Sequence, residues 1–324
     1  MSHLLGTLRG LDACSSPRGT FALLALDHRQ NLRKALRPAD PGAVTDADMA
    51  AFKSAVVRGL AGAATGILLD PEVGVAPAIA SGALPGSTGL VVALEATGYE
   101  GPAGARVSRL LAGWDAAHAK RIGASAAKLL VYYHPEAPNA ADQERLVADV
   151  AAACRRLDLA LLLEPLSFGL DGGKLTGERR RRVVVETARR LTALGPDVLK
   201  AEFPYDDGVA DEARWGDACA ELDAATAVPW VILSAGVDQA TFEGQVVAAC
   251  RAGASGVAVG RSVWAEAATM APGERDTFLA TTARKRLARI SSLVDAEAAP
   301  WRPRWLAAKR PDAPEPGWYL RDEP

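Results

Sequence analysis

Cysteine and histidine are scarce in this sequence, and their scarcity argues against two classes of protein. The 324 residues include four cysteines, with no CxxC pair, and four dispersed histidines. A disulfide-stabilised secreted domain would need closely spaced cysteines, and a zinc site would need ligands at regular spacing. We therefore expect reduced thiols, no metal ion and no other cofactor, which disfavours zinc-dependent chemistry.

Long apolar runs and an excess of one charge are also missing. No stretch approaches the roughly 20 apolar residues that span a bilayer, and the N-terminus lacks the apolar core of a secretion signal. The formal net charge is −2, so no overall field would recruit nucleic acid or an anionic membrane. We expect a cytoplasmic protein that binds no nucleic acid and no membrane, and whose partner is a small molecule.

Short apolar runs rich in Val, Ile and Leu are abundant, and helical patterns separate them. Eight such runs lie at residues 21–27, 65–70, 90–95, 126–133, 159–166, 197–204, 229–236 and 253–260. Amphipathic segments at 45–62, 141–157 and 176–195 carry helix signals, including Thr45 or Asp46 as an N-terminal cap and Gly195 at a C-terminus. Eight strand-then-helix units predict an α/β fold, a single (β/α)8 TIM barrel.

The domain boundaries follow from the same pattern. We expect one barrel over residues 1–299, followed by a Pro- and Trp-rich tail over 300–324. Because its aromatic rings would be costly to expose, we expect this tail to be an irregular segment that packs on the barrel or on a neighbouring subunit. The tail and the outer barrel helices also suggest a homo-oligomer.

Four ionisable residues interrupt the apolar runs near their C-terminal ends, where barrels build active sites. They are Asp27, Lys128, Glu164 and Lys200. Two lysines that face one lumen repel each other, and this repulsion together with desolvation lowers a lysine pKa and frees the amine to attack a ketone carbonyl. A carboxylate such as Glu164 then moves protons. The alternative is that buried ion pairs, Lys128 with Glu164 and Lys200 with Asp27, serve only the fold.

The last two strands are followed by a candidate phosphate site. Small residues after the seventh and eighth runs place Gly236 and Gly260 where barrels bind phosphate through backbone N–H groups. Ser234 adds a hydroxyl and Arg261 a positive charge. The alternative is that these glycines only permit tight turns.

Other polar residues carry weaker signals. Arg29 and His28 follow Asp27 directly and have two interpretations each: contact with a second anionic group of the substrate, or a loop position without a role in binding. We favour the first interpretation for Arg29 and the second for His28. Three carboxylates have two interpretations each: Asp70 and Glu95 support the lysines or cap helices, and Glu202 carries protons or forms an ion pair at the rim. His134 is interpreted as a turn residue.

Eight ordered segments between about Phe21 and Trp264 resemble the class I tagatose 1,6-bisphosphate aldolases and the related sulfofructosephosphate aldolases. These segments are ALDHR, GILLDPEVG, LVVALEATGYE, AKLLVYYHPE, LLLEP, DVLKAEFP, WVILSAGVD and GASGVAVGRSVWAE. The resemblance implies that Lys200 forms the Schiff base and that Glu164 is the acid/base. It further implies that Asp27 and Lys128 complete the cluster, and that Ser234, Gly236, Gly260 and Arg261 hold the phosphate of dihydroxyacetone phosphate. Where the family commonly reads DQR this chain has His28, at a position associated with specificity at the aldehyde end.

The sequence thus predicts a Schiff-base aldolase acting on a phosphorylated ketose, tagatose 1,6-bisphosphate or an epimer, which would yield dihydroxyacetone phosphate and glyceraldehyde 3-phosphate. Residues 70–100 look more like the tagatose branch, whereas the sixth unit and residues 230–238 look more like the sulfosugar branch. A 6-deoxy-6-sulfofructose 1-phosphate aldolase is therefore the first alternative. A noncatalytic phosphosugar-binding barrel and an isomerase that uses Glu164 as its base are the others.

Overall fold

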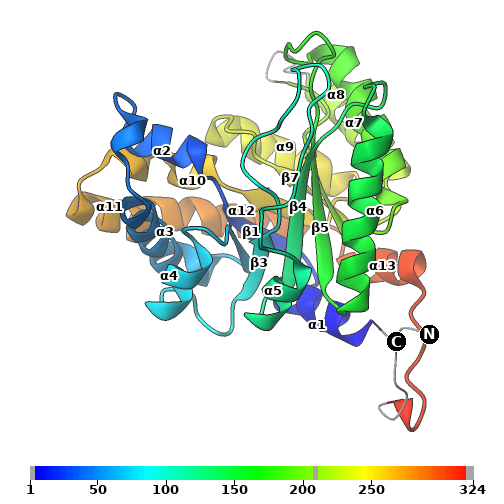
Figure 1. Ribbon diagram of the computed structural model, residues 1–324, viewed down its shortest axis with the longest axis horizontal. Coiled ribbons are helices and arrows are strands. Elements are labelled where there is room, and N and C mark those ends of the chain that lie inside the picture. The colour runs from blue at the N-terminus through cyan, green and yellow to red at the C-terminus, as the bar shows by residue number, and fades with distance from the viewer. Residues whose placement is uncertain (1–3, 207–210, 319–324) are drawn as a thin grey trace.

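Eight parallel strands close into a barrel in the computed structural model, which describes residues 4–206 and 211–318. The strands are β1 Phe21–Leu26, β2 Gly66–Leu69, β3 Gly89–Ala93, β4 Ala126–Tyr132, β5 Ala160–Leu166, β6 Val198–Ala201, β7 Trp230–Leu233 and β8 Gly256–Val259. Each strand pairs with the next in sequence, and β8 pairs back with β1 (Figure 1). The predicted (β/α)8 barrel is confirmed.

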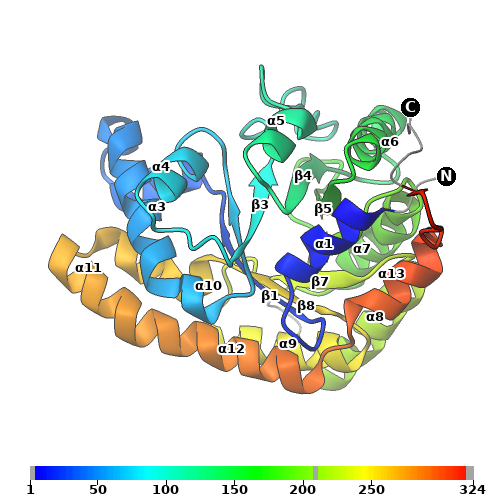
Figure 2. The ribbon, with the colours of Figure 1, turned by 90° about the horizontal axis from the view of Figure 1, so that it is seen from below.

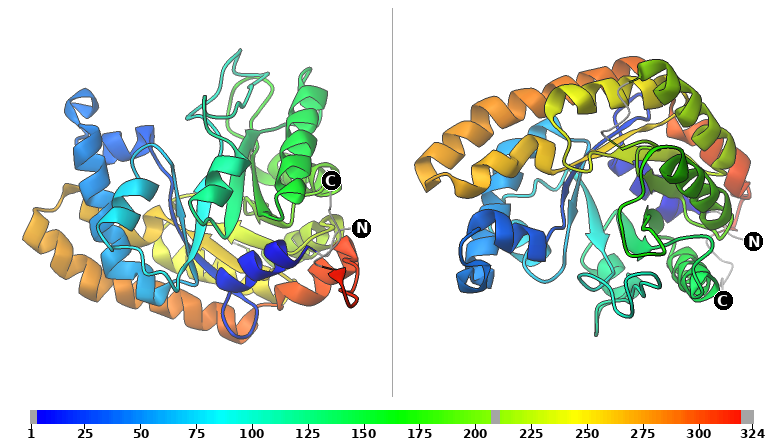
Figure 3. Two further views of the ribbon diagram at one scale, coloured as in Figure 1. Left: turned by 60° about the horizontal axis from the view of Figure 1, so that its bottom comes forward. Right: turned by 90° about the horizontal axis from the view of Figure 1, so that it is seen from above.

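Helices form the outer layer around the strands (Figures 1 and 3). They are α1 Leu5–Ala13, α2 Gln30–Leu36, α3 Asp46–Leu60, α4 Val75–Ala80, α5 Ala116–Arg121, α6 Ala140–Arg156, α7 Gly177–Thr192, α8 Glu212–Ala225, α9 Gln239–Arg251, α10 Arg261–Trp264, α11 Pro272–Phe278, α12 Arg284–Glu297 and α13 Trp301–Lys309. Single turns of 3₁₀-helix at Pro41–Ala43, Ala61–Ala63 and Ala265–Thr269, and a π-turn at Leu279–Ala283, join some of them. None of the helices described is long and apolar enough to cross a bilayer.

Local sequence explains where helix α3 begins. Thr45 caps α3 by accepting a hydrogen bond from the backbone N–H of Asp48, whose carboxylate accepts one from the N–H of Thr45 in return. This reciprocal capping satisfies two N–H groups that a helix start leaves open. Of the two caps considered from the sequence, Thr45 is the one used.

Gly256 permits the closure of the barrel between β8 and β1. Its φ is +142°, and a Cβ atom at this position would lie 1.9 Å from the carbonyl oxygen of Phe21. A side chain would collide with the neighbouring backbone, so only glycine allows the last strand to pair with the first at this point.

The lumen is apolar in its lower half and closed at the amino ends of the strands. Inward-facing residues include Leu23, Ala25, Leu68, Val91, Ala126, Leu162, Val198, Val231 and Ala258. Helices α1 and α13 cover this mouth, where Leu4, Leu11 and Trp305 join the same apolar cluster (Figure 2). Alternate residues of a strand share a face, so the residues two positions further along also face the lumen, nearer its opposite mouth. These residues include Asp27, Lys128, Glu164 and Lys200.

The expectation of an irregular tail is wrong for residues 301–309, which form α13. The helix starts after Pro300, and Pro303 lies in its first turn, where a missing N–H is tolerated. Trp301 and Trp305 lie one turn apart and are buried on the barrel. The Nε1–H of Trp305 also donates to the Asp197 carboxylate at 2.9 Å, which fixes the helix to the start of β6.

Candidate active site

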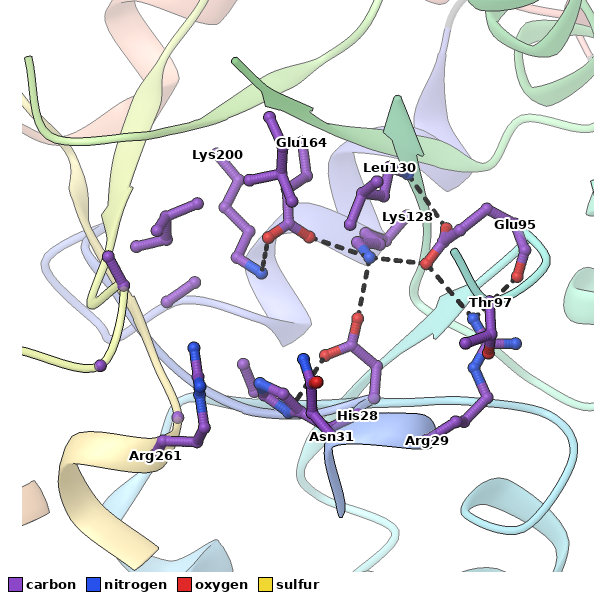
Figure 4. Close-up of a pocket in the computed structure, with 18 of the residues that line it drawn as sticks. His28, Arg29, Asn31, Glu95, Thr97, Lys128, Leu130, Glu164, Lys200 and Arg261 are labelled. Atoms are coloured by element: carbon purple, nitrogen blue, oxygen red, sulfur yellow. Dashed lines mark hydrogen bonds and ion pairs between the residues drawn. The ribbon is translucent and has the colours of Figure 1, made fainter. Parts of the chain in front are cut away.

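A cavity of about 550 Å³ opens at the carboxyl ends of the strands. Its lining contains the nine residues predicted to be catalytic or to bind substrate, which are Asp27, Arg29, Lys128, Glu164, Lys200, Ser234, Gly236, Gly260 and Arg261. Figure 4 shows the two lysines and Glu164 on one side of this cavity and Arg261 on another. The chain therefore brings together residues that lie up to 234 positions apart, as the sequence predicted, although their roles remain predictions.

Lys128 is fully buried and contacts three carboxylates. Its Nζ lies 2.8 Å from Asp27 Oδ2, 2.7 Å from Glu95 Oε1 and 2.9 Å from Glu164 Oε2. Burial alone would lower the pKa of Lys128, but the three negative charges outweigh it and hold this pKa well above its ordinary value. The expected repulsion between two lysines therefore does not govern Lys128, which is a permanent cation.

Lys200 is nearly buried, with 4% of its side chain exposed, and its amine donates to Glu164 Oε1 at 2.7 Å. Glu164 thus contacts both lysines, one with each oxygen. Burial raises the pKa of Glu164, but the charges of Lys128 and Lys200 outweigh this effect and lower it below its usual range. The ion pair between Lys128 and Glu164 that was considered as an alternative is present, whereas Asp27 pairs with Lys128 and not with Lys200.

Asp27 is held ionised by the same cluster. Burial acts to raise its pKa, but attraction to Lys128 and Lys200 prevails and keeps the pKa far below its ordinary value. The Lys200 amine and the ionised Glu164 carboxylate, in contact in a cavity that is open to bound compounds, form a pair that can exchange a proton with each other and with a bound carbonyl compound.

Glu95 and Asp70, whose roles the sequence left open, act differently. Glu95 supports Lys128 through Oε1, while its Oε2 accepts a hydrogen bond from the N–H of Leu130 at 3.0 Å. Asp70 instead pairs with the fully buried Lys53 of α3 and accepts a hydrogen bond from the N–H of Val73. Sequence reasoning missed Lys53, although a lysine on the apolar face of a predicted helix was a usable signal.

Arg29 is already engaged by protein groups. Its guanidinium lies 2.5 Å from the carboxylate of Glu72 and donates to the backbone oxygen of Glu95 at 2.9 Å. The Glu72 side chain is 45% exposed, so it can be displaced into solvent. An anionic substrate group that reached Arg29 would have to replace Glu72.

Arg261 supplies a positive charge at the end of the cavity near β7 and β8. Within the described residues it has no carboxylate partner. Ala235 and Gly236 both adopt positive φ, at +46° and +83°, and a Cβ on Gly236 would lie 3.3 Å from an Arg261 guanidinium nitrogen. Glycine at 236 therefore lets this loop approach the guanidinium. Ser234, nearly buried, lies just before it.

His28 lies in the segment between β1 and α2, as the loop interpretation expected, and it also lines the cavity. Its ring packs edge-on against Trp264, with centroids 5.3 Å apart, and its Nδ1 lies 4.0 Å from Asp27 Oδ1. Burial, which outweighs the attraction of Asp27, together with the positive charges of Arg261 and Lys200, lowers the pKa of His28 to about 4. The imidazole is therefore neutral near pH 7.

Glu202 and His134 have structural partners. Glu202 accepts hydrogen bonds from the N–H and hydroxyl of Ser167 and forms an ion pair with Arg180 at 3.1 Å, so the rim ion pair is present. His134 accepts a hydrogen bond from the N–H of Glu136 in the turn after β4. Across the described ranges, no group of three or more His, Cys, Asp or Glu side chains is arranged to hold a metal ion.

Sequence comparison finds relatives with a common description. The family model described as "DeoC/LacD family aldolase" matches residues 21–266. A tagatose 1,6-diphosphate aldolase of Listeria monocytogenes is 30% identical, with 91% of this chain and 94% of the relative covered. A tagatose 1,6-diphosphate aldolase 2 of Streptococcus pyogenes is 28% identical, with 87% and 93% covered.

Solved structures share the fold at lower identity. An archaeal fructose 1,6-bisphosphate aldolase superposes with a TM-score of 0.60 at 22% identity, covering 90% of this chain and 99% of that one. A fructose-bisphosphate aldolase from Slackia heliotrinireducens gives a TM-score of 0.64 at 15% identity, with 94% and 89% covered. At these identities the likeness concerns the barrel architecture.

Proposed function

Because this chain belongs to the DeoC/LacD family of aldolases, we propose that it cleaves a ketose 1,6-bisphosphate, tagatose 1,6-bisphosphate or an epimer, through a Schiff base on Lys200. The products would be dihydroxyacetone phosphate and glyceraldehyde 3-phosphate. The observation that carries this proposal is the 2.7 Å contact between the Lys200 amine and Glu164 in the cavity. The substrate class is supported by the Listeria monocytogenes relative, which is named for tagatose 1,6-diphosphate.

The reaction begins when Lys200 gives a proton to Glu164 and its neutral amine attacks the C2 carbonyl of the ketose. Glu164 returns the proton to the carbinolamine hydroxyl, which leaves as water, and an iminium forms. Glu164, ionised again after this step, takes the proton of the C4 hydroxyl, which becomes the aldehyde carbonyl as the C3–C4 bond breaks. The electron pair of that bond flows into the iminium and gives an enamine. Glu164 returns the proton to C3 of the enamine, and water hydrolyses the resulting iminium to dihydroxyacetone phosphate and free Lys200.

Lys128 and Asp27 set the charge of this pair. A permanent cation 2.9 Å from Glu164 keeps that carboxylate ionised, ready to accept the Lys200 proton. Asp27 and Glu95 neutralise part of the Lys128 charge, so that Glu164 is shared between the two amines and not captured by one. Lys128 and Asp27 thus act on the reaction through their charges and by positioning Glu164.

The two phosphates would occupy opposite parts of the cavity. The N–H groups near Gly236 and Gly260, the Ser234 hydroxyl and the Arg261 guanidinium would bind the phosphate at C1. Arg29 would bind the second anionic group once Glu72 moves away. This arrangement directs the C2 carbonyl towards Lys200, between the two ends.

Borohydride trapping tests the Schiff base directly. Incubation with dihydroxyacetone phosphate and sodium borohydride should add the reduced three-carbon phosphate to Lys200, as located by peptide mass spectrometry. Lys200→Met should abolish both the adduct and cleavage, because the thioether cannot form an imine. The control Lys285→Met replaces an exposed lysine of α12 and should retain both. An adduct elsewhere, or cleavage by Lys200→Met, would reject the mechanism.

Competition between ketoses tests the substrate. Equal concentrations of tagatose 1,6-bisphosphate, fructose 1,6-bisphosphate and 6-deoxy-6-sulfofructose 1-phosphate would be offered in one assay and the aldehyde products quantified. The proposal expects glyceraldehyde 3-phosphate to dominate. A dominant sulfolactaldehyde product would reject the bisphosphate assignment and leave the Schiff base untouched.

A further inference from the structure

His28 presents an imidazole that the proposed reaction does not use. The ring is held in place, because Trp264 packs against it edge-on at 5.3 Å and a Cβ on Gly260 would lie only 3.2 Å from its Cε1 atom. Trp264 is itself fixed by donating to the carbonyl oxygen of Ala25 and by packing on Phe52 of α3. His28 is therefore a rigid polar group in the cavity wall.

The two ring nitrogens have different surroundings. Nδ1 is buried and has no hydrogen-bond partner among the residues described, although it faces Asp27 Oδ1 at 4.0 Å. The other Asp27 oxygen is occupied by Lys128 at 2.8 Å, so Oδ1 remains available to the imidazole. Nε2 forms no hydrogen bond to the described chain and is not buried, so it is open to the cavity.

Four charged groups from four elements face this imidazole. Asp27 after β1 and Glu164 on β5 favour its protonated form, while Lys200 on β6 and Arg261 on α10 oppose it. In Figure 4 the His28 ring lies between Arg261 and the carboxylates around Lys128. A phosphate bound at Arg261 would cancel one opposing charge and place an acceptor beside the open side of the ring.

We propose that His28 takes up a proton when an anionic substrate binds, and that the resulting imidazolium bridges Asp27 and an anionic oxygen of the substrate. Both ring nitrogens of an imidazolium are donors, and in the bound state each would face an acceptor: Asp27 Oδ1 at Nδ1 and the substrate at Nε2. In the empty cavity only Asp27 is present. This proposal rests on the proposed function, and it makes His28 a positioning and specificity residue.

The proposal fixes the direction of the pH dependence. The empty cavity holds the pKa of His28 at about 4, and a bound anion would raise it. Binding therefore takes up a proton in the window between the two pKa values. Affinity should increase as the pH falls through this window and should become independent of pH, as far as His28 is concerned, above the pKa of the complex.

Selective isotope labelling of histidine provides the test, because the chain has four histidines. The imidazole resonances of wild-type protein would be titrated with and without dihydroxyacetone phosphate, and with inorganic phosphate as a second probe. His28→Gln assigns the resonance, and it keeps a neutral hydrogen-bonding group. We expect the His28 pKa to rise from about 4 to at least its ordinary value near 6.5 in the complex, a shift of about two units or more that corresponds to about a hundredfold tighter binding at low pH.

Proton uptake during binding provides a second readout. Isothermal titration in buffers of different ionisation enthalpy should show less proton uptake for His28→Gln than for wild type with the same ligand, since the titration of the ligand itself cancels in the comparison. The control His118→Gln changes an exposed histidine of α5 that pairs with Asp115, and it should match wild type.

The possible results separate this inference from the proposed function. An unchanged His28 pKa in a complex that still gives the borohydride adduct at Lys200 would overturn the role of His28 alone. Equal proton uptake by His28→Gln and wild type would do the same. Absence of the Lys200 adduct would reject the proposed mechanism, while a shift of the His28 pKa by inorganic phosphate would still support the proton-linked anion site.

Discussion

Lys128 carries a positive charge into the centre of the barrel, where it meets Asp27, Glu95 and Glu164. Replacing it with methionine would leave three buried carboxylates without their cation. We expect Lys128→Met to lose roughly 3 to 5 kcal/mol of unfolding free energy at pH 7, because removing one partner of a buried pair leaves uncompensated charge. Urea denaturation followed by circular dichroism would measure the loss.

The control for this prediction is Lys285→Met, which removes an exposed lysine of α12 and should change stability by less than about 0.5 kcal/mol. Lys128→Met should also lower activity, since the pKa of Glu164 would rise without its cationic neighbour. A Lys128→Met protein as stable as wild type would mean that the carboxylates repack or protonate at little cost.

The sequence predicted where the four charged residues lie better than it predicted how their neighbours shift their pKa values. Asp27, Lys128, Glu164 and Lys200 could be placed at one mouth because each is an ionisable residue within an apolar run, and the strand register then fixes their direction. The direction in which the Lys128 pKa shifts depends on how many carboxylates surround the amine. That number includes Glu95, which reaches Lys128 from outside β3 and whose role no local pattern determines.

Helix α13 packs on the apolar cluster at the amino ends of the strands. Its buried face carries Trp305, whose ring joins the lumen cluster and whose indole N–H donates to Asp197. We expect Trp305→Ala to cost about 3 to 5 kcal/mol, because it removes a large buried side chain and one of the donors that face the Asp197 carboxylate. Thermal unfolding and urea denaturation would measure this cost.

Activity should respond differently from stability in this variant. Trp305 lies at the amino ends of the strands and the cavity at their carboxyl ends, so trapping by dihydroxyacetone phosphate should persist at temperatures where the variant remains folded. Leu306→Ala changes the next residue of α13, which is 40% exposed, and should cost much less. Equal costs for Trp305→Ala and Leu306→Ala would contradict this account of α13.

The strands could be predicted from the sequence because parallel strands covered on both sides appear as continuous apolar runs. Helix α13 was missed because Pro303 and the neighbouring Trp residues suggested an irregular segment. Pro303 falls in the first turn of the helix, where proline is compatible with helix formation. Trp301 and Trp305 can form a buried face only against the barrel mouth, which no local sequence pattern reveals.

The charge cluster also governs how the whole molecule responds to acid. The pKa values of Asp27 and Glu164 are lowered in the folded state, so their contribution to stability is present above the ordinary carboxylate range near pH 4 and is lost as the pH falls towards the folded values. The pKa of Lys128 is raised, so its contribution is lost only at high pH, as the pH rises through the folded value.

We therefore expect the unfolding free energy to be nearly flat around pH 6 to 8 with respect to these groups, and to fall below about pH 4. Asp27→Asn removes one of the depressed carboxylates and should reduce the slope in the acid range by up to about 1.4 kcal/mol per pH unit. Urea denaturation at a series of pH values would give both slopes, and identical slopes would show that Asp27 does not contribute.

The paired covering of one barrel mouth by α1 and α13 has a consequence for biosynthesis. These helices come from opposite ends of the described chain, yet both pack on the same apolar lumen. When the ribosome has synthesised all eight strands but not α13, the apolar lumen is still uncovered at part of this mouth. Chains released before the Trp301–Trp305 segment emerges would expose this apolar surface to chaperones and proteases.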